Sequence, residues 1–336
     1  MVFTHANEPT VPTTDPREAV LGSDAFVLVE QSQPHPDRGR AIMIRYPDVR
    51  RLFGPSPISA ALAVVLVVLQ LWIAYAISEQ PIWVIFLASF FVGAFVDHAL
   101  WVLLHECAHH LVFRHKTLNR LLALFINFPF IVPSACQFCI YHLTHHKYLG
   151  DTRRDGDMPP RWEGWLLKHG FLGRLVWQCL YPLTQGTRTL SLDPRGRSLS
   201  WVRWVKWNVL VQVVFGLLLL YFAGRHTFRY LLMSVFLSIG PHPLGARWIQ
   251  EHYVFRAGQE TYSYYGPLNV LSLNIGYHNE HHDLPQIAWH RLPTLRRLMP
   301  EMYDGLYYHT SLVRLWLRFL FDGNLQLYRI GRQRDG

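Results

Sequence analysis

Three short segments of the chain are crowded with histidine, at spacings that place the side chains on one face of a helix. The segments read HECAHH (105–110), HLTHH (142–146) and HNEHH (278–282). His105 and His109 are spaced i, i+4, and the other two segments combine i, i+3 and i, i+4 spacings. Imidazoles this close together cannot all be cationic without repelling one another, and neutral imidazole is the commonest metal ligand in proteins. The pattern therefore predicts metal binding.

The number of clustered histidines indicates how many ions are bound. The three segments carry nine of the 19 histidines, which exceeds what one ion can bind, so two ions are predicted. Imidazole sites suit zinc, copper, iron or nickel, and ligand type alone does not choose among these metals. We expect the carboxylates of Glu106, Glu280 and Asp283 to orient ligating imidazoles rather than to act as catalysts.

A zinc protease is the rival interpretation of the first segment. HECAH is an HExxH pattern, which on a helix supplies two zinc ligands and Glu106 as a general base. Such a site needs only one further ligand and a water molecule. It leaves HLTHH and HNEHH without a role, so the protease is the weaker alternative.

Composition places these segments in a membrane protein. Half of the 336 residues are hydrophobic, 14% are aromatic and the net charge is +9. The basic residues gather beside apolar segments, which is typical of loops facing an anionic membrane leaflet. The aromatic residues interleave with leucine and valine rather than with arginine, which argues against nucleic-acid binding.

Four apolar runs predict the membrane spans of an all-α integral membrane protein. We expect a cytosolic N-terminal segment (1–56), with one short helix near Asp48 to Phe53, and a membrane domain (57–336). The runs cover residues 58–77, 82–104, 207–222 and 228–245. The first is apolar enough and long enough to cross a bilayer. A further segment, 119–137, is interrupted by Asn127, Pro129 and Pro133, which predicts an interfacial or re-entrant path.

This topology predicts that the three histidine segments meet on one face of the membrane. The first ends the second span, the second follows the re-entrant segment, and the third follows the last span. Lys and Arg residues such as Arg114, Lys116 and Arg120 lie on the same face, which the positive-inside rule makes cytoplasmic. We therefore expect a cytoplasmic cap that holds the histidines.

The histidine segments resemble the three histidine boxes of the membrane fatty-acid desaturase and hydroxylase superfamily. Four longer stretches are similar to sphingolipid Δ4-desaturases, also called dihydroceramide desaturases: HPDRGRAIMIRYPDVRRLFGP, YHLTHHKYLGD, EHYVFRAGQETYSYYGPLN and NIGYHNEHHDLPQIAWHRLP. The resemblance runs from about Pro34 to Tyr308. Two positions depart from the family, with His110 in place of the usual asparagine and Arg247 in place of histidine.

The resemblance implies a di-iron centre that uses O₂ as co-substrate. Carried over onto this chain, the ligands are His105, His109, His142, His145, His146, His278, His281 and His282. A ninth ligand is expected after the last span. His252, in QEHYVF, is preferred for it over His242, whose flanking prolines suggest a kink.

The resemblance further implies a reaction: formation of a trans Δ4 double bond in the sphingoid base of a dihydroceramide-like lipid. A sphingolipid C4-hydroxylase and a fatty acyl lipid desaturase are the alternatives within the superfamily. No cytochrome b5-like HPGG motif occurs, so we expect a separate electron donor, such as cytochrome b5 or ferredoxin with its reductase. The expected location is the endoplasmic reticulum in a eukaryote or the cytoplasmic membrane in a bacterium.

Overall fold

The structure is a computed structural model that describes residues 21–23, 25–191, 199–325 and 327–333. The described chain is mostly helical, and its strands form only two small sheets, β1-β2-β5 and β3-β4. These strands are β1 (Leu21–Ser23), β2 (Phe26–Leu28), β3 (Ser263–Tyr264), β4 (Tyr308–His309) and β5 (Arg329–Gly331). The prediction of a mostly helical chain is confirmed.

Among the described residues, three helical segments are long and apolar enough to cross a membrane. The first is α2 (Ile58–Ala76), whose 19 residues span about 28 Å, close to the thickness of a bilayer core. The second, Ile82–Ala108, is built from α3 (Ile82–Ala88), a π-helical turn (Ser89–Gly93) and α4 (Ala94–Ala108). The third, Leu199–Ala223, joins α9 (Leu199–Val202) to α10 (Val205–Ala223), and only 11% of its most apolar window is buried, which leaves its side chains for lipid. These segments agree with the first three predicted spans.

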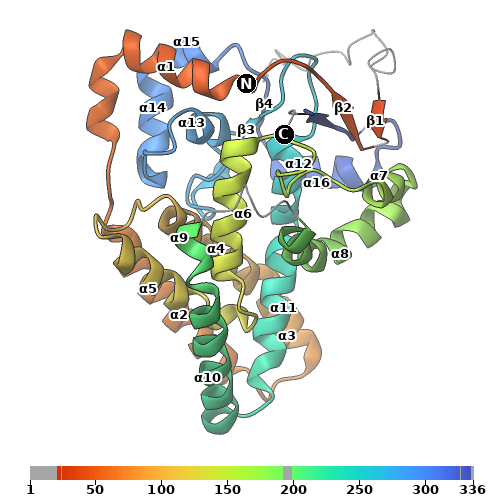
Figure 1. Ribbon diagram of the computed structural model, residues 1–336. Coiled ribbons are helices and arrows are strands. Elements are labelled where there is room, and N and C mark those ends of the chain that lie inside the picture. Colours follow the sequence, from red (N-terminus) through yellow and green to blue (C-terminus); the bar gives the residue numbers. More distant parts are fainter. Residues whose placement is uncertain (1–20, 24, 192–198, 326, 334–336) are drawn as a thin grey trace, which may run out of the picture.

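The predicted fourth span, 228–245, is wrong as a continuous helix. Helix α11 (Thr227–Ile239) has 13 residues and is followed by Gly240, Pro241 and a 3-10 turn (Pro243–Ala246). Proline has no N–H to donate, so the helical ladder cannot continue through this sequence. Helix α11 packs against α4 and α3, and Figure 1 shows it in the lower, tapering part of the molecule.

The interrupted segment after the first histidine cluster is sharply bent. Helix α5 (Lys116–Ile126) and a 3-10 turn (Phe128–Phe130) precede α6 (Ala135–Tyr148), and the two parts meet at 116°. If the two parts count as one broken span, the pair makes a fourth crossing of the membrane. A re-entrant loop, which enters and leaves the membrane on one side, has the same bent shape. The bend lies where Asn127, Pro129 and Pro133 interrupt the apolar run, as the sequence predicts.

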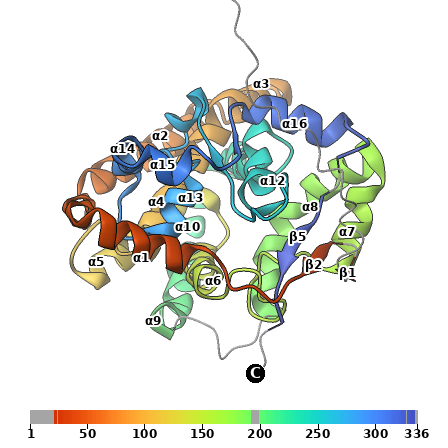
Figure 2. The ribbon, with the colours of Figure 1, turned by 90° about the horizontal axis from the view of Figure 1, so that it is seen from above.

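The N-terminal segment and the C-terminal third lie together above one end of the apolar helices (Figures 1 and 2). The N-terminal part contains α1 (His35–Arg45) and a 3-10 helix (Pro47–Leu52), whereas the sequence predicts one helix near residues 48–53. The C-terminal helices are α12 (Arg247–His252), α13 (His278–Asp283), α14 (Leu292–Leu298), α15 (Pro300–Tyr303) and α16 (Leu312–Phe321), with 3-10 turns at Pro267–Asn269 and Trp289–Arg291.

Two helices follow residue 160. They are α7 (Arg161–Lys168) and α8 (Gly170–Ser191), and His169 separates them. Gly170, the first residue of α8, has a φ of +59°, which is strained for other residues. Trp177 of α8 and Phe319 of α16 are buried in one hydrophobic cluster. This packing joins α8 to the C-terminal helices.

A close backbone approach holds α1 against α13. A Cβ atom on Gly39 would lie 2.4 Å from the backbone oxygen of Asp283. In an exposed helix, changing glycine to alanine stabilises by about 1 kcal/mol. Here we expect the opposite, a destabilisation of about 1–3 kcal/mol, because the methyl group forces α1 away from α13. Thermal unfolding of the Gly39→Ala protein in detergent measures this. An unfolding temperature at or above that of the unaltered protein would contradict the contact.

Candidate metal centre

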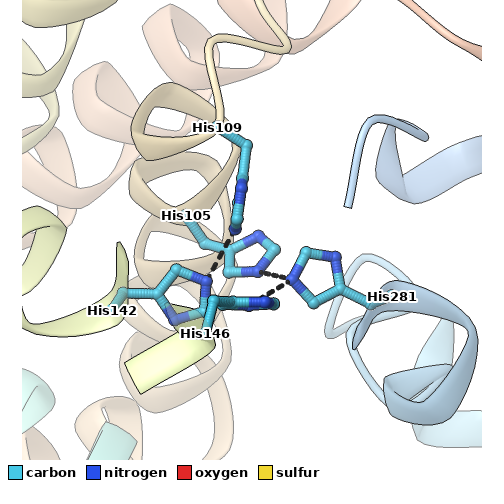
Figure 3. Close-up of side chains that lie close together, drawn as sticks. All are labelled: His105, His109, His142, His146 and His281. Carbon is cyan, nitrogen blue, oxygen red and sulfur yellow. Dashed lines mark hydrogen bonds between the residues drawn. The ribbon is translucent and has the colours of Figure 1, made fainter. Parts of the chain in front are cut away.

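Five of the predicted histidines form a first group. The group joins the end of α4 to α6 and α13, and one ring nitrogen from each member lies within 4.8 Å of those of the others. Its members are His105, His109, His142, His146 and His281 (Figure 3). His281 Nε2 lies 2.8 Å from His105 Nε2 and 2.9 Å from His146 Nε2. His109 Nε2 lies 2.8 Å from His142 Nε2.

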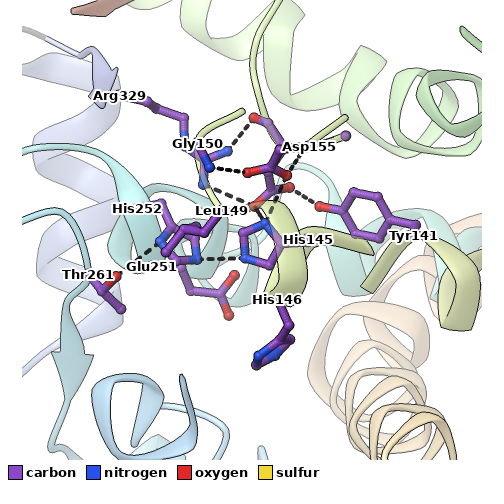
Figure 4. A network of polar contacts seen from close by, with 12 residues as sticks. Tyr141, His145, His146, Leu149, Gly150, Asp155, Glu251, His252, Thr261 and Arg329 are labelled. Atoms are coloured by element: carbon purple, nitrogen blue, oxygen red, sulfur yellow. Dashed lines mark hydrogen bonds and ion pairs between the residues drawn. The ribbon is translucent and has the colours of Figure 1, made fainter. Parts of the chain in front are cut away.

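The other four predicted histidines form a second group beside the first. His145, His252 and His282 each offer one nitrogen to a set that also lies within 4.8 Å. His252 Nε2 faces His145 Nε2 at 3.0 Å, as Figure 4 shows, and His278 Nε2 at 2.9 Å. All nine histidines of the predicted ligand set are therefore brought together, five in one group and four in the other.

The donor set fits a pair of cations. The Nε2 atoms of His105 and His146 converge on that of His281, and those of His145 and His278 converge on that of His252. A ring nitrogen carries one proton or one lone pair, so each central Nε2 atom is able to make a good hydrogen bond to only one of its two neighbours. His282 Nε2 is also buried and has no hydrogen-bond partner among the described residues. Nitrogens arranged in this way are able to hold metal ions.

The imidazoles of α13 are kept neutral, which is the state that ligation needs. Burial lowers the pKa of His281 well below its usual value of 6.5, and the neighbouring histidines, His105 first, lower it further. The pKa of His282 is lowered in the same way, by burial and then by His146. Burial and the adjacent His278 likewise lower the pKa of His252. Each ring therefore has a lone pair available near neutral pH.

Carboxylates adjoin the outer nitrogens of several of these rings. Asp155 Oδ1 lies 2.9 Å from His145 Nδ1. Burial, the largest single effect, would raise the pKa of Asp155, but His145, Arg329 and the backbone N–H of Asp157 together hold this pKa below its usual value. Glu106 and Glu251 lie farther away, at 3.7 Å from the Nδ1 atoms of His105 and His278 respectively. Such partners fix the orientation of a ligating ring and raise its basicity.

The sequence pattern does not single out Asp155 or Glu251. Asp155 sits in the loop GDTRRDGD after the second histidine segment, where its Oδ2 atom also accepts a hydrogen bond from Gly150 N at 2.7 Å. Glu251 directly precedes His252. The available signal was an acidic residue within ten positions of a histidine box, which is too common to be selective.

The expectation for Glu280 and Asp283 needs correction. Among the described contacts, Glu280 accepts hydrogen bonds from Ser263 Oγ at 2.8 Å and Tyr265 Oη at 2.6 Å. Burial raises the pKa of Glu280 to about 7, against the opposing effect of these hydrogen bonds. Asp283 pairs with His35 and Arg38 of α1. Neither carboxylate is hydrogen-bonded to a histidine of the two groups; both instead support the helix that carries three of those histidines.

Two further histidines lie outside both groups. His242 Nε2 contacts the carbonyl oxygen of Phe90 at 3.1 Å, and its Nδ1 accepts a hydrogen bond from Leu244 N. With both nitrogens engaged, His242 caps the turn that follows α11. His110 has a positive φ of 57° and its ring stacks 6.3 Å from that of Trp201. The geometry therefore favours His252 over His242 as the ninth member of the set.

The contacts of Glu106 do not suit a protease. Its carboxylate accepts a weak hydrogen bond from Trp289 N at 3.3 Å and lies on the Nδ1 side of His105. The Nε2 side of His105 faces the histidine group. A general base for zinc-bound water would have to lie on that side.

A narrow cavity lies between the two groups and the apolar helices. Its lining includes four histidines (His105, His142, His145 and His278), four apolar side chains (Trp101, Phe138, Trp248 and Ile275) and four other polar side chains (Tyr141, Asp157, Arg247 and Glu251). Its volume of about 20 Å³ has room for little more than one water molecule. The histidines thus share this cavity with apolar side chains, and the described conformation would have to open to admit a lipid chain.

Comparison with known proteins places this fold and site in a class. The family model described as fatty acid desaturase matches residues 81–312, a range that contains all nine histidines. The chain belongs to the fatty acid desaturase family.

A narrower group is shown by a second match and by the relatives. The family model described as sphingolipid Delta4-desaturase matches residues 23–58. The chain is 37% identical to the sphingolipid delta(4)-desaturase DES1 of Homo sapiens, over 94% of this chain and 97% of that protein. It is 36% identical to the DES1 of Drosophila melanogaster, over 93% and 96%. The human sphingolipid delta(4)-desaturase/C4-monooxygenase DES2 is 38% identical over 90% and 93%. Within the fatty acid desaturases, the chain is thus one of the sphingolipid Δ4-desaturases.

Proposed function

We propose that this protein is an oxidoreductase that introduces a trans Δ4 double bond into the sphingoid base of a dihydroceramide-like lipid. The observation that carries the proposal is the pair of histidine groups, in a chain whose relatives bear the name of sphingolipid Δ4-desaturase. Removal of one hydrogen from each of two adjacent carbons, with two further electrons and two protons, reduces O₂ to two water molecules.

The nine histidines are the proposed ligands of two iron ions, with one ion at each group. Bound there, iron supplies O₂ activation, which the side chains alone cannot perform. The protein's own side chains position the histidine rings and exclude water from the site. Asp155 holds the ring of His145, and Trp101 and Phe138 keep an apolar surface beside the histidines. These two apolar side chains suit contact with an acyl chain.

The proposed setting is an integral membrane protein with its site on the cytoplasmic face. The candidate spans leave apolar side chains for lipid, and the segments joining them near the site carry Arg114, Lys116 and Lys147. The N-terminal segment and the C-terminal helices lie above the spans on this face, and together they form the proposed cap. A separate electron donor, such as cytochrome b5 or ferredoxin with its reductase, delivers electrons there.

A second candidate reaction is hydroxylation at C4. It is favoured by the 38% identity to a relative named both desaturase and C4-monooxygenase. Both reactions begin with removal of a hydrogen from the same region of the chain, so one site is able to support either.

Mass spectrometry of lipids separates the two reactions. Cells that contain dihydroceramide, expressing this protein, should accumulate a lipid lighter by two hydrogens. A gain of one oxygen with no loss of two hydrogens would identify a hydroxylase instead. Unchanged dihydroceramide in cells that supply a working donor would contradict both.

A further inference from the structure

Helix α1 inserts a histidine beside the second histidine group. His35 is 3% exposed, and its ring centre lies 4.9 Å from that of His282. Its Nδ1 atom lies 2.7 Å from Asp283 Oδ1 and its Nε2 atom 2.8 Å from Thr261 Oγ1. Both ring nitrogens are therefore engaged, so His35 is not a further ligand. It must act through its neighbours.

A chain of polar contacts connects His35 to His252. Thr261 Oγ1, which is buried, lies 2.8 Å from His35 Nε2 and 3.4 Å from His252 Nδ1. The carbonyl oxygen of Glu260 lies at the same distance, 3.4 Å, from His252 Nδ1. Figure 4 shows the contact between Thr261 and His252, with the Nε2 side of the His252 ring turned toward His145. The relay therefore runs from Asp283 through His35 and Thr261 to the far side of a proposed ligand.

The chemistry of the groups gives the relay a direction. A carboxylate only accepts, so His35 Nδ1 donates to Asp283. In the tautomer that carries its proton on Nδ1, the Nε2 atom of His35 is an acceptor. The hydroxyl of Thr261 donates its proton to His35 and accepts one from His252 Nδ1. With its proton on Nδ1, His252 carries its lone pair on Nε2, the atom that faces His145 and His278. The tautomer that binds metal is thus the one that Thr261 of the relay and the Glu260 carbonyl together favour.

Neighbours on α1 hold the start of the relay in place. Arg38 Nε donates to Asp283 Oδ2 at 2.6 Å, and a terminal nitrogen of Arg38 donates to Asn279 Oδ1 at 2.9 Å. Gly39 allows the two helices to touch. Arg38 thus holds the carboxylate of Asp283 in place, and this carboxylate in turn orients the ring of His35.

We propose that His35 and Thr261 are positioning residues that set the tautomer and orientation of His252, so that the N-terminal helix completes the second metal site. The inference rests on the proposed function, since it assumes that His252 binds iron. It adds a role for α1, which lies in the segment 23–58 outside the range of the fatty acid desaturase match.

The test compares two substitutions of Thr261 in the purified, iron-loaded protein. Thr261→Val keeps the shape and removes the hydroxyl, whereas Thr261→Ser keeps the hydroxyl. Iron loss to a chelator is followed with time. Wild type and Thr261→Ser should lose both irons slowly, while Thr261→Val should lose one of its two irons about 10- to 100-fold faster. His35→Ala should behave like Thr261→Val, and the double variant should be no faster than either.

Arg40→Ala is the matched control on α1, because Arg40 is exposed and pairs only with Asp37 among the described residues. It should release iron as wild type does. Equal rates for Thr261→Val and wild type, or for Thr261→Val and Thr261→Ser, would overturn the relay. Simultaneous loss of both irons from the Thr261→Val protein, together with a lowered unfolding temperature, would also overturn the relay. A wild-type protein that holds no iron would overturn the proposed function as well, which distinguishes the two failures.

Discussion

Replacement of His281 by alanine is expected to abolish the desaturated product and to remove iron from the first histidine group. His281 Nε2 lies within 2.9 Å of the Nε2 atoms of both His105 and His146, so it stands at the centre of that group. Loss of a supporting partner beyond a metal's ligands already costs about 10- to 100-fold in affinity or activity, and loss of a central ligand should cost more than about 100-fold. Product formation and iron content of the purified variant measure this.

His309→Ala provides the control for that experiment. His309 is also a buried histidine, but it packs against the rings of Phe255 and Tyr262 and belongs to neither histidine group. Its replacement should lower stability while leaving two irons bound. Full activity of His281→Ala, or iron loss from His309→Ala equal to that from His281→Ala, would contradict the ligand assignment.

Substitution of Asp155 by asparagine is expected to weaken iron binding in the second group by about 10- to 100-fold. Asp155 Oδ1 lies 2.9 Å from His145 Nδ1 and also accepts a hydrogen bond from the backbone N–H of Asp157, at 2.9 Å. Asparagine keeps the size but removes the charge that stabilises the His145 N–H. Iron bound per chain as a function of free iron concentration, measured alongside activity, gives the change in affinity.

Asp151→Asn tests whether that effect belongs to the carboxylate beside His145. Asp151 lies in the same loop and accepts hydrogen bonds from Arg153 N and Arg154 N, away from the histidines. It should affect folding of the loop without changing iron affinity. If Asp155→Asn bound iron as tightly as the unaltered protein, the carboxylate would have no supporting role.

Much of the candidate site follows from local sequence spacing. A helix brings residues i, i+3 and i+4 to one face, so His142, His145 and His146 are grouped by the sequence alone. The same periodicity explains why Glu280 points elsewhere. Residues two apart do not face each other on a helix, so a carboxylate at i+2 from His278 lies away from the ligand face.

The parts of the site that could not be predicted depend on contacts between distant segments. His35 meets Thr261 across 226 positions, and nothing in the polar sequence around His35 indicates that its helix is buried against α13. The prediction of one continuous helix over residues 228–245 was wrong for a different reason. Averaged hydropathy gives little weight to Gly240 and Pro241, although they end α11. Assigning Glu251 and Asp155 to the histidines required the folded geometry.

The metal content of the purified protein tests the central claim most directly. Two histidine groups, of five and four members, predict two irons per chain. His252→Ala should retain iron in the first group and lose it from the second. One zinc and no iron per chain would contradict the account and would return the HExxH pattern of residues 105–109 to the protease interpretation.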